Sequence, residues 1–286
     1  VLILDEIQEC PEARTALKFF RMDGRYDVIG TGSLLGVKGY GKEPKSIPVG
    51  SETVIDMYPL DFEEFLWANG VAAPVIDMLR HCLQKEVPVP EALHNRMKQL
   101  LLQYAVVGGM PDAVQTFVDT KQMDAVLQIQ RDIVRSYEDD MVKYAERKDK
   151  SKIRECFQSI PRQLSKENKK FQYSVVKKGS TSSKYAGSLQ WIEDAGIIVR
   201  AYNLSITELP LDGNAEEDVF KVYMRDCGLF VSMLEDGTQF DILSGNLHGY
   251  KGAIFENLVA DIFGKMGRSL YSVSYTHLRA HETSLH

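Results

Sequence analysis

The sequence predicts an α/β fold that continues into a long helical region and a second, smaller α/β region. Three observations favour this assignment. The chain opens with four apolar residues that run into Asp5 and Glu6, as a buried parallel strand does at its carboxyl end. Residues 73–146 repeat apolar side chains at helical spacing. Farther along, strand-like runs at 197–202 and 220–229 follow helical segments.

The composition is that of an ordinary globular protein. The 286 residues are 44% hydrophobic and 26% charged, which is enough for two or three compact units. No run of about 18 apolar residues occurs, so we expect no membrane span. The four cysteines form no C-x-x-C pair, which disfavours a zinc site or a disulfide framework and favours a cytoplasmic location.

The strand that ends in Asp5 and Glu6 has the form of a Walker B motif. In nucleotide hydrolysis of this type, the first carboxylate holds Mg²⁺ through a water molecule and the second polarises the attacking water. We therefore assign the metal to Asp5 and the catalytic role to Glu6. The competing interpretation is a core strand that ends in a solvated acidic turn.

A second short strand, residues 26–33, ends in small polar residues. In this topology the strand beside Walker B carries a hydroxyl that hydrogen-bonds the γ-phosphate or the attacking water. Ser33 is the first candidate for this nucleotide sensor and Thr31 is the second. A Gly/Ser turn that merely closes a strand is the alternative.

The segment after the sensor strand begins with a glycine- and lysine-rich loop, residues 36–50. A third strand is predicted at 53–58. A helix then begins after Asp61, which is a plausible N-cap, with Glu64 as its capping-box partner.

No phosphate loop of the form G-x-x-x-x-G-K-[ST] occurs, and the chain does not start with Met. We therefore expect a fragment of a P-loop NTPase whose intact parent binds ATP and Mg²⁺ and hydrolyses ATP. Charged hydrogen bonds to phosphate contribute about 1.5 to 3 kcal/mol each, so losing four costs about 6 kcal/mol, or roughly 10⁴-fold in affinity. The chain itself is expected to be inactive.

Three stretches, LDEIQECPEA, TGSLLG and YPLDFEEFL, occur in the order found in bacterial and archaeal AAA+ ATPases that carry a C-terminal domain of unknown function. The chain resembles this family from Val1 to about Tyr271. The resemblance implies a partial AAA+ core at 1–72, a helical lid at 73–146 and a homo-oligomer formed through the core. Many relatives carry a basic residue where this chain has Ser51, which puts fast hydrolysis and ring assembly in doubt.

The lid region contains a Gly-Gly-x-Pro turn at residues 108–111, which matches the family's turn between lid helices. Its glycines permit close approach of another backbone, and Pro111 begins the next helix. We expect these residues to have a structural role rather than a catalytic one.

Residues 143–184 are strongly basic, with ten lysines and three arginines against four acids. The order helix, turn, helix and β-ribbon over 147–204 predicts a winged helix, and the family resemblance supports it. Its second helix would enter a DNA groove while nearby lysines meet phosphates. The expected contacts are Lys169, Lys170, Lys177, Lys178 and Lys184. A solvated lysine-rich helix face and a protein docking module are the alternatives.

Residues 205–272 are expected to form a truncated domain behind a hydrophilic linker at 211–218. The domain resembles a restriction-endonuclease fold, in which Glu256 is a first-helix acid, but the metal-binding hairpin of such a nuclease does not occur in the chain. Residues 273–286 back-translate into a sequencing adapter and are interpreted as an artefact.

Taken together, the sequence predicts part of an ATP-binding and ATP-hydrolysing AAA+ protein that acts on or near nucleic acid. The alternative is a DNA- or protein-binding regulator that uses nucleotide as a switch with little turnover.

Overall fold

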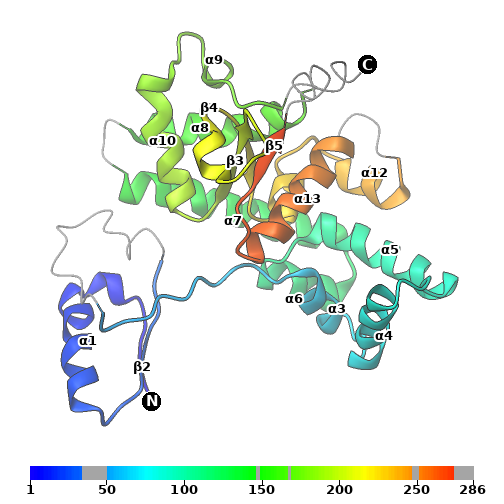
Figure 1. Cartoon of the computed structure of the whole chain (residues 1–286), viewed down its shortest axis with the longest axis horizontal. Coiled ribbons are helices and arrows are strands. Elements are labelled where there is room, and N and C mark those ends of the chain that lie inside the picture. Colours follow the sequence, from blue (N-terminus) through cyan, green and yellow to red (C-terminus); the bar gives the residue numbers. More distant parts are fainter. Residues whose placement is uncertain (34–49, 146–148, 167–168, 247–250, 274–286) are drawn as a thin grey trace.

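The computed structural model describes the chain except residues 34–49, 146–148, 167–168, 247–250 and 274–286. A small N-terminal unit is joined by an extended segment, residues 50–61, to a larger body (Figure 1). We call this segment the connector. The predicted loop at 36–50 lies almost entirely outside the described residues, as does all but the first residue of the predicted artefact at 273–286.

The N-terminal unit contains two parallel strands and one helix. Strand β1 pairs with β2 in the register Leu2↔Val28 to Leu4↔Gly30. The helix starts with Pro at its first position and ends at a left-handed glycine. The elements are β1 (Leu2–Leu4), η1 (Ile7–Glu9), α1 (Pro11–Asp23) and β2 (Val28–Gly30).

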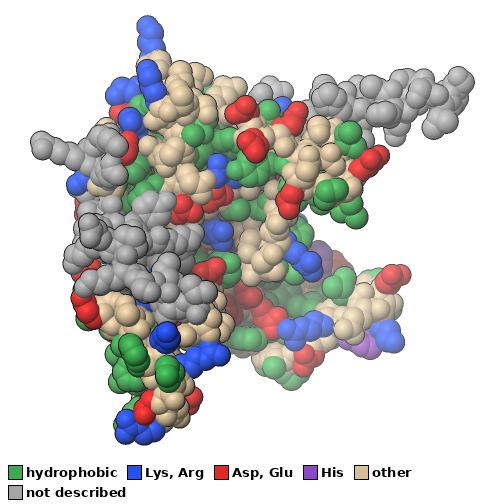
Figure 2. All heavy atoms as spheres, turned by 60° about the vertical axis from the view of Figure 1, so that its left-hand side comes forward, with side chains coloured by type: hydrophobic (Ala, Val, Ile, Leu, Met, Phe, Trp, Pro, Cys, Tyr) green, Lys and Arg blue, Asp and Glu red, His purple; other side chains and the backbone are tan. Residues whose placement is uncertain are grey.

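Two predictions for this part of the chain are wrong. The first strand is not buried, since the Ile3 side chain is 65% exposed and α1 has no buried residue. Hydrophobic side chains therefore lie on the surface of this unit (Figure 2). Residues 53–58 form no strand, because the structure gives their backbone no ladder partner, and Met57 is 95% exposed. β-propensity alone does not make a strand without a neighbour.

The connector leads into α3 (Phe62–Ala68), which begins as predicted. The Asp61 carboxylate accepts from the Glu64 backbone N–H at 2.8 Å, and the Glu64 carboxylate accepts from the Asp61 N–H at 2.8 Å. This reciprocal pair is a capping box, which satisfies two N–H groups that the helix itself cannot.

The body continues with helices whose apolar faces were visible in the sequence. The Gly-Gly-x-Pro turn joins α5 to α6, and Pro111 is the first residue of α6, as predicted. The helices after α3 are α4 (Ala73–Gln84), α5 (Glu91–Val107), α6 (Pro111–Thr120), α7 (Met123–Tyr144), α8 (Lys150–Leu164), α9 (Tyr173–Val176) and α10 (Ser182–Asp194).

A second sheet has the strand order β4-β3-β5. Strands β3 and β4 are antiparallel, while β5 is parallel to β3. Residues 211–218 differ from the expected linker, because they form a 3₁₀ turn and the start of β4 within one hairpin. The remaining elements are β3 (Ile198–Leu204), η2 (Leu211–Asn214), β4 (Ala215–Met224), α11 (Cys227–Ser232), α12 (Thr238–Ser244), α13 (Lys251–Lys265) and β5 (Tyr271–Val273).

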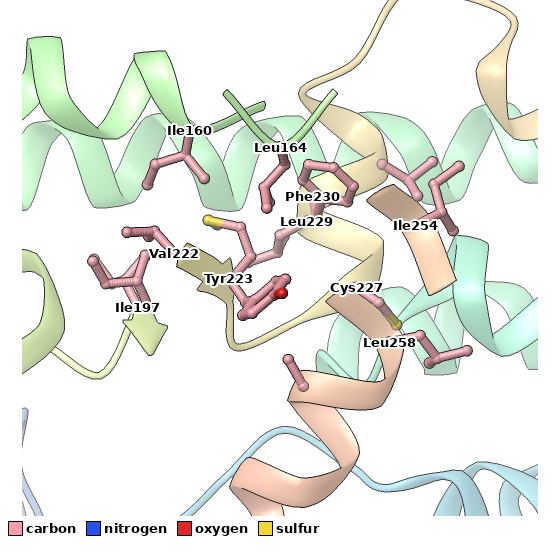
Figure 3. Close-up of a cluster of buried hydrophobic side chains, with 14 of the residues drawn as sticks. Ile160, Leu164, Ile197, Val222, Tyr223, Cys227, Leu229, Phe230, Ile254 and Leu258 are labelled. Atoms are coloured by element: carbon pink, nitrogen blue, oxygen red, sulfur yellow. The ribbon is translucent and has the colours of Figure 1, made fainter. Parts of the chain in front are cut away.

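One continuous hydrophobic core runs through the body from α3 to α13. Its centre brings side chains of α8, β4, α11 and α13 together (Figure 3). Apolar positions predicted for α8 and α10 are buried there, including Phe157 and Leu189. Among the described helices, none combines the length and the apolar character needed to cross a bilayer.

The Gly-Gly-x-Pro turn generates a test of this packing. A Cβ added at Gly109 would lie 2.0 Å from the Leu60 carbonyl oxygen, which is a backbone atom that cannot swing aside. We expect Gly109→Ala to lower the free energy of unfolding by about 3 kcal/mol in urea titrations. Gly187→Ala is the matched control, because its Cβ meets nothing within 4 Å inside α10 and should stabilise by about 0.5 to 1 kcal/mol. Equal effects at both sites would contradict the packing.

Candidate functional site

The two predicted Walker B acids lie where the carboxyl ends of β1 and β2 meet. Thr31 is fixed to β1 by two backbone hydrogen bonds, from its N–H to the Leu4 carbonyl and from the Ile7 N–H to its own carbonyl, both at 2.9 Å. Its hydroxyl donates to the Asp5 carboxylate. The parallel register therefore brings Asp5, Glu6 and Thr31 to one edge of the sheet.

Glu6 adopts a left-handed backbone conformation with φ of 51°. A non-glycine residue in this region costs about 1 to 2 kcal/mol, so the surrounding contacts must hold the turn. Ile7, the next residue, is buried against Gly30, where an added Cβ would lie 2.9 Å from the Ile7 side chain. The strained turn leaves the Asp5 and Glu6 side chains exposed at the edge.

Of the two sensor candidates, the structure brings Thr31 against Asp5. Ser33 lies two residues farther along the exposed chain that leaves β2. The ranking of Ser33 before Thr31 stays a prediction, because the contact of Thr31 with Asp5 does not show which hydroxyl would face a phosphate.

The predicted role of Asp5 in holding Mg²⁺ stays a prediction. Magnesium keeps several water ligands and takes one or two carboxylates, and an exposed Asp5 with a neighbouring hydroxyl oxygen fits that requirement. In the described part of the chain, no group of three or more His, Cys, Asp or Glu is placed to hold a metal directly.

An ion pair missed in the sequence ties the connector back to this unit. The Arg14 guanidinium contacts Glu52 through two hydrogen bonds, at 2.6 and 3.3 Å, and both side chains are largely buried. Arg–carboxylate pairs with two bonds fix geometry as well as charge.

The predicted phosphate-contacting lysines separate into two groups. Lys177, Lys178 and Lys184 are exposed around α9 and α10, and basic side chains project at this end of the molecule (Figure 2). Lys170 is half-buried. Lys169 instead turns inward, and its ammonium lies 2.6 Å from the Glu256 carboxylate.

Two acids neutralise part of the basic segment. Glu155 accepts from Lys177 at 2.7 Å and from the Tyr185 hydroxyl at 2.7 Å, and these bonds, first that from Lys177, lower the pKa of its carboxyl. Glu256 accepts from Lys169, from Lys221 at 3.1 Å and from the Tyr223 hydroxyl at 3.1 Å. The predicted role of Glu256 near a nuclease site stays a prediction. In this structure the Glu256 carboxylate is held by three hydrogen-bond donors of the body.

A buried polar network in the body was not predicted. It joins Tyr104 of α5, Asp226 before α11, and Asp261 and Lys265 of α13, all of them buried side chains. The available signal was the pair of charges at i and i+4 near the end of the otherwise apolar α13. Tyr104 and Asp226 are far away in sequence, so no local pattern could have joined them to that pair.

Comparison with known protein families follows the same division of the chain. Residues 1–66 match the family model described as AAA domain. The match supports a nucleotide-binding, ATPase-type function for this region, and it confirms the predicted resemblance there. Residues 98–239 match a second model, described as a domain of unknown function (DUF8612). No curated protein and no solved structure matches the chain significantly.

Proposed function

We propose that the N-terminal unit supplies the magnesium- and water-positioning half of an ATP-hydrolysing site. The observation that carries the proposal is the hydrogen bond from Thr31 to Asp5 at the carboxyl ends of two parallel strands, within the region that matches an AAA domain. Open α/β sheets bind ligands at this edge. The sequence contains no phosphate loop, so the proposal concerns this half of the site alone.

Each residue has one role in the proposed site. Asp5 holds a water of the Mg²⁺ shell, and the Thr31 hydroxyl fixes the orientation of that carboxylate. Glu6 accepts a hydrogen bond from the attacking water and orients it in line with the γ-phosphate. Ser33 is the further hydroxyl that can reach a phosphate oxygen. Mg²⁺, when bound with ATP, supplies neutralisation of the phosphate charge.

The proposal includes contact with nucleic acid through the α9–α10 end of the body. The order α8, α9, α10 and the β3–β4 hairpin is that of a winged helix, and this support is structural rather than a family match. Lys177, Lys178 and Lys184 are exposed in this part of the chain, and Lys170 is half-buried. Because Lys169 is paired with Glu256, we leave it out of the proposed contact surface.

The hydrolysis proposal is tested by turnover measurements. The 286-residue chain should show no ATP turnover above background, because it lacks the phosphate loop. In a longer gene product that includes such a loop, Glu6→Gln should lower kcat about 10²-fold or more while ATP still binds. Asp27→Asn is the control, since this exposed acid lies at the opposite end of β2.

Two results would decide against hydrolysis by this site. Turnover by the 286-residue chain that Glu6→Gln abolishes would refute the expected inactivity. Slow turnover in the longer product, unchanged by Glu6→Gln, would instead favour the regulator that uses nucleotide as a switch.

The nucleic-acid proposal is tested by the salt dependence of duplex DNA binding. Each phosphate contact contributes about 0.9 to the slope of log affinity against log salt. The double variant Lys178→Glu with Lys184→Glu should therefore weaken binding and reduce that slope by about 2. Lys85→Glu with Lys98→Glu is the matched control, because both lysines are exposed on α4–α5 and far along the chain from the basic segment. Equal loss in both double variants would mean that only overall charge matters.

A further inference from the structure

The hydrogen bonds of Leu60 fix the end of the connector to the body. The Leu60 N–H donates to the Gly109 carbonyl at 2.7 Å. Its carbonyl accepts from the Tyr104 hydroxyl at 2.8 Å and from the Lys265 ammonium at 3.1 Å. Two residues earlier, the Tyr58 ring lies under the Arg225 guanidinium, 5.4 Å from ring centre to carbon. The attachment of the N-terminal unit to the body therefore passes through a small set of polar groups.

These groups are buried around Lys265, and each proton of its ammonium has a hydrogen-bond acceptor. Its three ammonium protons meet the Leu60 carbonyl, the Tyr104 hydroxyl at 2.9 Å and the Asp261 carboxylate at 2.9 Å. Tyr104 has no exposed surface, and Asp261 is 2% exposed. An ammonium in such a setting is stable only with acceptors on each proton.

Asp226 and Asp261 place two carboxyl groups near this one ammonium. Asp226 accepts from the backbone N–H groups of Gly109 and Leu229 at 2.7 and 2.8 Å. One carboxylate oxygen of Asp261 accepts a hydrogen bond from Lys265. The other oxygen is buried and has no hydrogen-bond partner among the described residues. Burial raises the pKa of Asp226, although Lys265 and the backbone donors act in the opposite direction, and the bare oxygen of Asp261 likewise disfavours the ionised form of Asp261.

The groups that face Asp261 come from each element packed around it. They are Lys265 on its own helix, Asp226 and Cys227 at the start of α11, Tyr104 from α5, and Arg225 at the end of β4. Burial, the largest cause, and the charge of Asp226 raise the pKa of Asp261 to about 7, although Lys265 and Arg225 act in the opposite direction. When both carboxyl groups are ionised, two buried negative charges face one lysine.

We propose that this network is a pH-sensitive latch, in which neutral Asp261 keeps Leu60 docked on the body and ionised Asp261 favours release of the connector. Release of the connector lets water reach the Asp261 oxygen that has no hydrogen-bond partner. The latch does not depend on nucleotide hydrolysis, and it would set how freely residues 1–57 move relative to the body.

The sign of the pH dependence follows from linkage. The carboxyl has a higher pKa in the docked state than in the open state, to which we assign the value of a hydrated Asp, near 3.9. The docked state is therefore favoured at low pH, and this advantage is lost as the pH rises toward 7. For these two values, the opening equilibrium increases about 50-fold between pH 5 and pH 7 and little above pH 8.

Amide hydrogen exchange of Leu60, corrected for its intrinsic rate, measures the opening. In the wild type, the protection factor should fall about 50-fold from pH 5 to pH 7. In Asp261→Asn the protection should be flat over the same range, because the amide cannot ionise. Asp241→Asn is the matched control, since Asp241 is exposed on α12, and it should keep the wild-type slope.

Tyr104→Phe separates the latch from simple packing. It removes one donor to the Leu60 carbonyl and one acceptor of Lys265 but leaves Asp261 able to ionise, so protection should fall at every pH while the pH dependence remains. A flat wild-type profile would overturn the proposal even if a variant failed to fold. So would a wild-type slope that persisted unchanged in folded Asp261→Asn.

Discussion

The constraint on which the body depends is the meeting of three backbones at the Gly-Gly-x-Pro turn. An added Cβ would lie 2.3 Å from the Asp226 carboxylate at Gly108, 2.0 Å from the Leu60 carbonyl at Gly109, and 2.4 Å from the Val107 carbonyl at Gly228. Only glycine permits these approaches. They allow the Asp226 carboxylate to accept from the Gly109 N–H and at the same time to cap α11. One buried carboxylate thus joins the α5–α6 turn to the last part of the chain.

The N-terminal unit is held by different forces. Of its described residues before the connector, Ile7 alone belongs to the buried hydrophobic set, and β1 and β2 have no neighbour beyond each other in their sheet. Its order comes from the parallel register, the Thr31–Asp5 bond and the Arg14–Glu52 ion pair. Polar geometry without a large core can fix an arrangement locally, but it contributes less to stability than burial does.

The positive charge of the basic segment is not spread evenly over the surface of the protein. The fold directs Lys169 to Glu256 and Lys177 to Glu155, so part of the positive charge is neutralised within the body. Lys178 and Lys184 are exposed around α9 and α10, and so is Lys177 although it is paired with Glu155. A count of charges along the sequence gives the sign of the field, whereas the contacts decide which ammonium groups are available to a phosphate.

The sequence by itself determined the elements that depend on neighbouring residues. These include the capping box at Asp61, the helices with apolar stripes and the strand that ends at Asp5. The AAA resemblance of the first 66 residues was also visible there. Tertiary structure alone decided the exposure of β1, the unpaired backbone at 53–58 and the buried network around Lys265. The physical reason is the separation in sequence of the residues that interact. Caps and helical faces arise from contacts within a few residues. Burial, strand pairing and the contact of Leu60 with Lys265 join segments that are distant in the chain.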